Sequence, residues 1–169
     1  MYLFFDTETT GLPKKRKASV SDVDNWPRLV QLAWLIYDDN GRQMASRNDI
    51  IYPDGFTIPR PAARVHGIST TRARSEGIPV TESLTAFNKA IHRVKYLVAH
   101  NMAFDEKVIG AELVRAQYNT RFFKKSKICT MQSSVKYCGI PGKRGGYKWP
   151  KLSELHIHLF GKDFDDAHD

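Results

Sequence analysis

Two acidic side chains near the start of the chain have a spacing that suits metal-ion chemistry. The apolar run 2–5 is short enough for a buried β-strand, and Asp6-Thr7-Glu8 follows it directly. Side chains two residues apart on a strand point to the same face, so Asp6 and Glu8 would project together. Neighbouring carboxylates repel each other unless a cation lies between them, and such oxygen ligands favour Mg²⁺ or Mn²⁺. A solvent-exposed strand end is the alternative, because this spacing is common by chance.

A third carboxylate follows a second short apolar run. Residues 96–99 predict a strand, and the segment His-Asn-Met-Ala-Phe-Asp at 100–105 follows it and opens a helix. Ligand-binding groups of α/β sheets gather beyond the carboxyl ends of parallel strands, so we expect Asp105 near Asp6 and Glu8. The alternative role of Asp105 is that of a first-turn acid stabilised by the helix dipole.

A histidine near the end of the chain is a further candidate. The last three residues are Ala-His-Asp at 167–169. The intrinsic pKa of histidine lies close to neutrality, so His168 could serve as a general base if it lay beside a metal site. Without such a site it is a tail residue.

Positive charge is concentrated in one part of the chain. The net charge of +8 comes from 26 Lys and Arg against 18 Asp and Glu, yet residues 113–153 contain no acid. This distribution favours a face that meets a polyanion such as nucleic acid, although a solvated lysine-rich surface explains it equally well. A second basic run, 14–17, lies close to the first acids, and an exposed flexible loop is its simpler interpretation.

The strand pattern predicts a mixed sheet. Residues 29–37 form a second apolar run, and the turn signal Asp-Asp-Asn-Gly at 38–41 leads into a returning strand near 43–52. Another short strand is expected to start at Ile128. Hairpins give antiparallel pairs and strand–helix–strand units give parallel ones, so we predict an α/β fold with a five-stranded mixed sheet flanked by helices.

The helix pattern is clearest in the second half of the chain. Apolar residues at steps of three and four predict a helix after Pro79 and another that runs to about Tyr118. A last helix should end at Gly161, a residue that favours helix C-termini. The segment 53–77 contains three prolines and three glycines, and we expect a loop with at most a short helix there.

Length and composition fit a single globular domain. The chain has 169 residues, of which 41% are hydrophobic and 26% are charged. The apolar run 2–5 is too short for a signal peptide or a membrane span, so a cytoplasmic protein is expected. Cys129 and Cys138 have neither a zinc-site spacing nor that of a disulfide framework, and we expect free thiols.

Taken together, these motifs resemble those of the histidine-bearing branch (DEDDh) of the DnaQ-like 3′-to-5′ exonucleases. The first family motif is similar to Asp-Thr-Glu-Thr-Thr-Gly-Leu at 6–12, and the second to residues 100–105. The loop Val-His-Gly-Ile at 65–68 is similar as well. The third motif resembles Leu-Ser-Glu-Leu at 152–155, leading to 167–169. The matching segments occur in the family order.

The resemblance implies an RNase H-like fold and an exonuclease that releases nucleoside 5′-monophosphates. In this family two Mg²⁺ or Mn²⁺ ions stabilise the attacking and leaving oxygens of an in-line displacement. Carried over residue by residue, Asp6, Glu8 and Asp105 would be catalytic metal ligands. His168 would be the base that deprotonates the attacking water.

The resemblance and the charge pattern also suggest contacts to nucleic acid. Positions that match nucleotide-binding residues of the family are Thr9, Thr10, Leu12, His66, Asn101 and Phe104. Core packing is the alternative for Phe104, and a structural hydrogen bond for His66. Candidates for phosphate contacts in the basic stretch are Lys143, Arg144, Lys148 and Lys151, with Tyr147 and Trp149 available for base stacking.

One element of the family pattern has no match. A fourth carboxylate follows the histidine by five residues in the family, whereas Asp169 is the last residue here. We therefore expect residues 1–169 to form one exonuclease domain without the C-terminal helix that carries this ligand, and to bind metal weakly.

Substrate and partner are open at this point. Single-stranded 3′ ends of DNA are the expected substrate, RNA is the alternative, and a catalytically impaired nucleic-acid-binding domain of the same fold is a third interpretation. The family includes the proofreading epsilon subunits of bacterial DNA polymerase III, so a DNA polymerase subunit is an expected partner.

Overall fold

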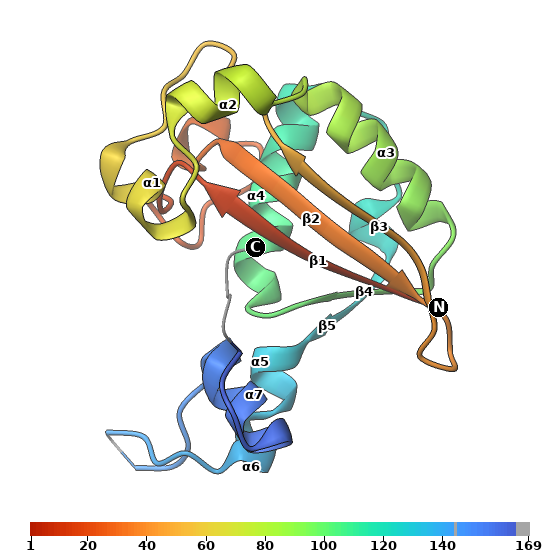
Figure 1. Cartoon of the computed structure of the whole chain (residues 1–169), viewed down its shortest axis with the longest axis vertical. Helices are drawn as coiled ribbons and strands as arrows, with labels where there is room; N and C mark the ends of the chain where they lie inside the picture. The colour runs from red at the N-terminus through yellow and green to blue at the C-terminus, as the bar shows by residue number, and fades with distance from the viewer. Residues whose placement is uncertain (144, 165–169) are drawn as a thin grey trace.

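A five-stranded mixed sheet forms the centre of the molecule. The computed structural model describes residues 1–143 and 145–164. The strands are β1 (Tyr2–Thr9), β2 (Leu29–Tyr37), β3 (Gln43–Ile50), β4 (Tyr96–Ala99) and β5 (Ser126–Cys129). Their order across the sheet is β3-β2-β1-β4-β5, as Figure 1 shows. β2 pairs antiparallel with β1 and β3, whereas β4 pairs parallel with β1 and β5. The predicted RNase H-like α/β architecture is confirmed.

Two long helices cover one face of this sheet. They are α3 (Val80–His92) and α4 (Met102–Arg115). Phe5 of β1 and Trp34 of β2 pack in one buried cluster with Phe87 of α3 and Val108 of α4. The predicted helix after Pro79 is thus confirmed, and its apolar positions supply part of the core because they recur on one side of the helix.

The shorter elements lie at the two ends of the sheet. Near one end are α1 (Arg60–His66) and α2 (Thr70–Glu76), as seen in Figure 1. Beyond β5, on the other side, α5 (Thr130–Ser133), α6 (Val135–Cys138) and α7 (Leu152–Phe160) form a small group. Two single turns of 3-10 helix, η1 (Val23–Asn25) and η2 (Phe122–Lys124), lie in the connections.

The expectation of a loop at 53–77 is wrong, because two helices of seven residues occupy most of it. Its prolines and glycines mark helix boundaries. Gly67 is in the left-handed conformation, with φ of 73°, and its N–H donates to Ala63 to end α1. The hydroxyl of Ser69 accepts from the Arg72 N–H and so caps the start of α2. Smaller differences occur elsewhere, since α4 ends at Arg115 and β5 begins at Ser126.

The lengths of β1 and β4 decide where the acids can meet. β1 has eight residues, but β4 pairs only with its first part, up to Phe4. Alternate β1 residues, including Phe5 and Thr7, are buried on the helix-covered face, and Asp6 and Glu8 lie on the opposite face. The second half of β1 therefore has β2 on one side and no β4 partner on the other.

Two further expectations concern the whole chain. In the part of the chain that the structure describes, no helix is both long enough and apolar enough to span a bilayer. Cys129 and Cys138 are free thiols.

Candidate active site

The start of α4 brings a third carboxyl group to β1, beside the part of the strand that β4 does not reach. Asp105 lies in the first turn of α4 and is 3% exposed. The hydroxyl of Thr7 donates a hydrogen bond of 2.7 Å to Asp105 Oδ1. Thr7 is the residue between Asp6 and Glu8, so this bond joins the first and second sequence motifs at one point.

The electrostatic environment of Asp105 is unusual for an acid. Burial and, after it, the negative charge of Asp6 raise the pKa of the Asp105 carboxyl from 3.8 to about 8. The Thr7 hydroxyl acts in the opposite direction, because its hydrogen bond stabilises the charged form, but it does not offset the other two effects. In the metal-free protein Asp105 is therefore largely protonated at neutral pH.

The chemistry of these acids fits a divalent metal ion. Within residues 1–143 and 145–164, no three His, Cys, Asp or Glu side chains form a ready-made metal cluster. The donors that do meet are the carboxyls of Asp6 and Asp105, whose repulsion a divalent cation would relieve. This donor set consists of oxygen atoms, with no thiol or imidazole, and therefore fits Mg²⁺ or Mn²⁺. His168 lies outside the described residues.

The chain after β1 is held in place by a buried ion-pair network. The Thr10 N–H donates to the carbonyl of Arg28 at 3.0 Å, and the Arg28 N–H donates to the Thr10 hydroxyl at 3.0 Å. The guanidinium of Arg28 in turn bonds to Glu112 of α4, which is 1% exposed and also pairs with Arg115. Thr9, 8% exposed, donates to the carbonyl of Gly11 at 2.7 Å. Sequence reasoning missed Glu112, because nothing in its spacing distinguishes it from a surface acid of a helix.

A cavity of about 560 Å³ opens next to these elements, and we call it the basic cavity. It is lined by Leu12, Pro13, Arg16, Lys17, Trp26, Asn101, Ala103, Phe104, Met131, Gln132 and Trp149. Three of the predicted nucleotide contacts, Leu12, Asn101 and Phe104, thus lie together on its walls, although Phe104 also packs against the core. Met131 and Gln132 carry no sequence signal that would have found them.

The other predicted contacts are more scattered. His66 is 5% exposed, and its Nδ1 accepts the backbone N–H of Ile68, so it has the structural hydrogen bond that was the alternative. Lys148 forms an ion pair with Glu154, whose other oxygen accepts the N–H of Lys151. Lys143 is exposed, and Arg144 lies outside the described residues.

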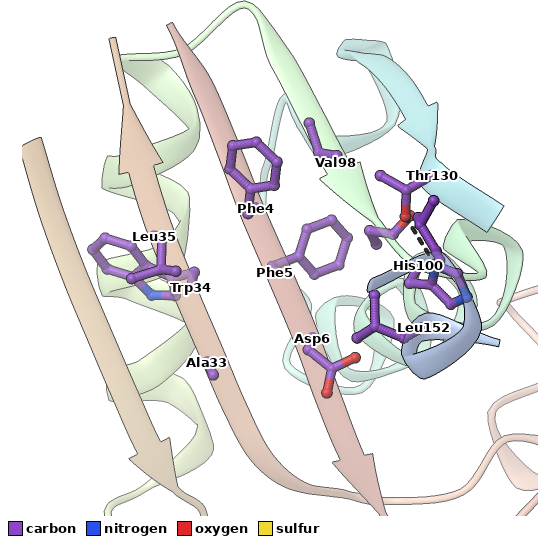
Figure 2. A pocket seen from close by; sticks show the side chains of 12 residues that line it. Phe4, Phe5, Asp6, Ala33, Trp34, Leu35, Val98, His100, Thr130 and Leu152 are labelled. Atoms are coloured by element: carbon purple, nitrogen blue, oxygen red, sulfur yellow. Dashed lines mark hydrogen bonds between the residues drawn. The ribbon is translucent and has the colours of Figure 1, made fainter. Parts of the chain in front are cut away.

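The sheet face that carries Asp6 also borders an apolar cavity of about 360 Å³. Figure 2 shows Asp6 near Phe4 and Leu152, with Val98 on the neighbouring strand. His100 closes one side: its Nδ1 lies 3.0 Å from the hydroxyl of Thr130, and its Nε2 lies 3.1 Å from the carbonyl of Pro150. His100 therefore ties the second motif to α5 and to the segment before α7.

Comparison with protein families identifies the family of this chain. The sequence profile of the RNase T-type exonuclease family matches residues 3–168. The chain belongs to this exonuclease family. Membership places the carboxyl-rich end of β1 in a family of metal-dependent nucleases. Comparison with curated protein sequences gave no match.

Solved structures share the exonuclease fold at low sequence identity. Escherichia coli Exonuclease I in complex with a dT13 oligonucleotide is 20% identical, with a TM-score of 0.71, over 99% of this chain and 37% of that one. A complex described as ExoI/SSB-Ct is 20% identical, with a TM-score of 0.70, over 98% of this chain and 37% of that one. A product-bound exonuclease I is 19% identical, with a TM-score of 0.68, over 98% of this chain and 39% of that one. The chain therefore spans less than two-fifths of the length of these proteins, and the likeness establishes the fold.

Proposed function

We propose that this chain is a 3′-to-5′ exonuclease that depends on divalent metal ions and removes nucleoside 5′-monophosphates from single-stranded DNA ends. The observation that supports this most directly is the Asp105 carboxyl, which accepts a hydrogen bond from Thr7 and whose pKa is raised by burial and by the charge of Asp6. A protein that only binds nucleic acid gains nothing from clustered acids, since they repel phosphate.

The three acids and His168 have different parts in the proposed reaction. Asp6, Glu8 and Asp105 would hold the metal ions, and the Thr7 hydroxyl keeps Asp105 turned toward β1. When bound, the ions stabilise the negative charge on the attacking and leaving oxygens. His168 takes the proton of the water that attacks the phosphorus atom, and the 3′ oxygen of the preceding nucleotide leaves.

The chain after β1 would position the terminal nucleotide. Thr10 is fixed to Arg28 and thereby to Glu112, so the backbone at Thr9 and Thr10 is held rigidly beside the acids. Leu12 lines the basic cavity and is 79% exposed, so its apolar side chain can lie between the terminal base and the base that precedes it. Rigid placement of this kind lowers the entropic part of the barrier.

The test is a degradation assay with the 169-residue chain in excess Mn²⁺. Single-stranded DNA labelled at its 5′ end should shorten stepwise from the 3′ end and release 5′-monophosphates. Asp6→Asn should lose this activity, whereas Asp54→Asn, an exposed acid in a loop, should keep it. Equal release by the wild type and Asp6→Asn, or shortening from the 5′ end, would refute the proposal.

The same assay decides between the alternatives for the substrate, and a primer assay tests the partner. Faster release from RNA than from DNA would assign an RNA substrate, and binding without any release would favour the catalytically impaired domain. The sequence also resembles the proofreading epsilon subunit of bacterial DNA polymerase III. A polymerase partner stays a prediction, to be tested by faster removal of a mismatched 3′ nucleotide from a primer than of a matched one.

A further inference from the structure

We infer that the basic cavity binds the nucleotide that precedes the 3′-terminal one, with its base stacked on Trp149 and its phosphates beside Arg16 and Lys17. This inference rests on the proposed function, because it assigns the next nucleotide of the same strand. A duplex buries its base faces, so a site of this type selects single-stranded ends.

The basic run 14–17 is not a free loop. Asn25 is 5% exposed, and its side-chain oxygen accepts the N–H of Lys15 at 2.7 Å while its amide donates to the Lys15 carbonyl at 3.0 Å. The Lys14 N–H also donates to the Asn25 carbonyl. Three hydrogen bonds to one nearly buried residue therefore hold the backbone at Lys14 and Lys15, and the next two cations, Arg16 and Lys17, line the cavity.

The cavity is also lined by an exposed aromatic ring on a tethered segment. Trp149 is 63% exposed, although it lines the cavity. The next residue, Pro150, is bound through its carbonyl to His100 Nε2. A largely exposed indole that lines a cavity is suited to stacking on a nucleobase.

The charge of Arg16 and Lys17 is available to a ligand. In the described ranges 1–143 and 145–164, neither Arg16 nor Lys17 lies within ion-pair distance of an acid. Lys148 and Lys127, in the basic stretch that the sequence highlighted, already pair with Glu154 and Glu106. Arg16 and Lys17 can thus neutralise phosphate without breaking a bond within the protein.

Tryptophan fluorescence provides a direct test, because the chain has three tryptophans and the other two are nearly buried. Trp26 is 4% exposed and Trp34 is 9% exposed. A short single-stranded oligothymidylate, added in EDTA so that no hydrolysis occurs, should quench the fluorescence of the 169-residue chain. Trp149→Phe should remove most of the quenching and leave only the part due to Trp26, which also lines the cavity, and Trp34→Phe should retain it. Quenching that is undiminished in Trp149→Phe overturns the inference.

Binding of a labelled oligothymidylate, followed by anisotropy, gives the second measurement. Trp149→Ala should weaken binding roughly tenfold or more, and Trp149→Phe should restore most of it. Arg16→Ala with Lys17→Ala should also flatten the salt dependence, by about 0.7 in logarithmic slope for each phosphate contact. Lys89→Ala with Arg93→Ala removes two exposed charges from the region of α3 and should leave that slope unchanged.

Two outcomes separate this inference from others. If Trp149→Ala weakens binding of thymidine monophosphate as much as that of the oligonucleotide, Trp149 belongs to the terminal-nucleotide site and the inference is wrong. If the quenching and the salt effects occur but no nucleotide is released in Mn²⁺, the binding site stands and the proposed exonuclease function fails.

Discussion

Replacing Asp105 by Asn should make the metal-free protein more stable at alkaline pH. The side chain of Asn has the shape of a protonated carboxyl, and its oxygen can still accept the Thr7 hydroxyl. It cannot ionise, so the variant avoids the cost of placing a charge in a site that is 3% exposed. The effect should depend strongly on pH.

The magnitude follows from the change in pKa on folding. The pKa of Asp105 is raised, from 3.8 to about 8, so the folded protein holds a proton that the unfolded chain loses. The stability due to this proton is complete below pH 3.8 and is lost as the pH rises through about 8. One pKa unit corresponds to about 1.4 kcal/mol, so the wild type should lose about 4 kcal/mol relative to Asp105→Asn between pH 5 and pH 8. A typical domain has a free energy of unfolding of only about 5–15 kcal/mol.

Urea unfolding in EDTA at several pH values measures this difference. The free energy of unfolding of Asp105→Asn minus that of the wild type should increase steadily with pH. Asp54→Asn, which removes an exposed acid, reports the effect of the same change in net charge. If the wild type and Asp105→Asn give parallel curves from pH 5 to pH 8, Asp105 is charged in the folded protein and the reasoning is refuted.

A second variant separates the two causes of the raised pKa. Burial is the larger cause and the charge of Asp6 the smaller one. In Asp6→Asn the pH-dependent loss should therefore persist but end at a lower pH. Disappearance of the loss in this variant would show that charge repulsion, and not burial, governs Asp105.

Two further variants test contacts that hold the fold together. Gly77→Ala should destabilise the protein by about 1–3 kcal/mol in urea unfolding. A Cβ at Gly77 would lie 2.3 Å from the Ala73 carbonyl oxygen and 2.6 Å from the Tyr52 nitrogen. Unchanged stability would mean that the backbone around Gly77 moves apart easily. Glu112→Ala should cost about 3–5 kcal/mol, because it leaves Arg28 and Arg115 without their acid. Glu112→Gln, which can still accept the Leu29 N–H, should cost less, and equal losses for the two would contradict the role of that hydrogen bond.

The sequence was most informative where a local pattern determines the structure. Alternation along β1 places Asp6 and Glu8 on one face, as predicted, because strand geometry alone fixes which neighbours share a face. The helical period after Pro79 likewise depends only on local spacing. The same local signals misled at 53–77, since proline and glycine occur both in loops and at the ends of short helices.

Contacts between distant segments could not be predicted from the sequence. The burial of Asp105 requires β4 to end before β1 does, and no residue pattern reveals that difference in length. The Asn25 hydrogen bonds to Lys15 hold the backbone of an apparently flexible basic run, yet Asn25 looks like an ordinary turn residue. Both features depend on tertiary geometry, for which a single sequence contains little information.

The alternation of β1 also links correct folding to correct chemistry. Thr7 is buried toward Asp105, whereas Asp6 and Glu8 lie on the other face. A slip of β1 by one residue against β2 would turn Asp6 and Glu8 into the hydrophobic core and Phe5 out of it. The cost of burying two charges makes that misaligned form too unstable to persist. Folded molecules are therefore those in which Asp6 and Glu8 lie on the face opposite the core, so stability selects for the arrangement that the proposed function requires.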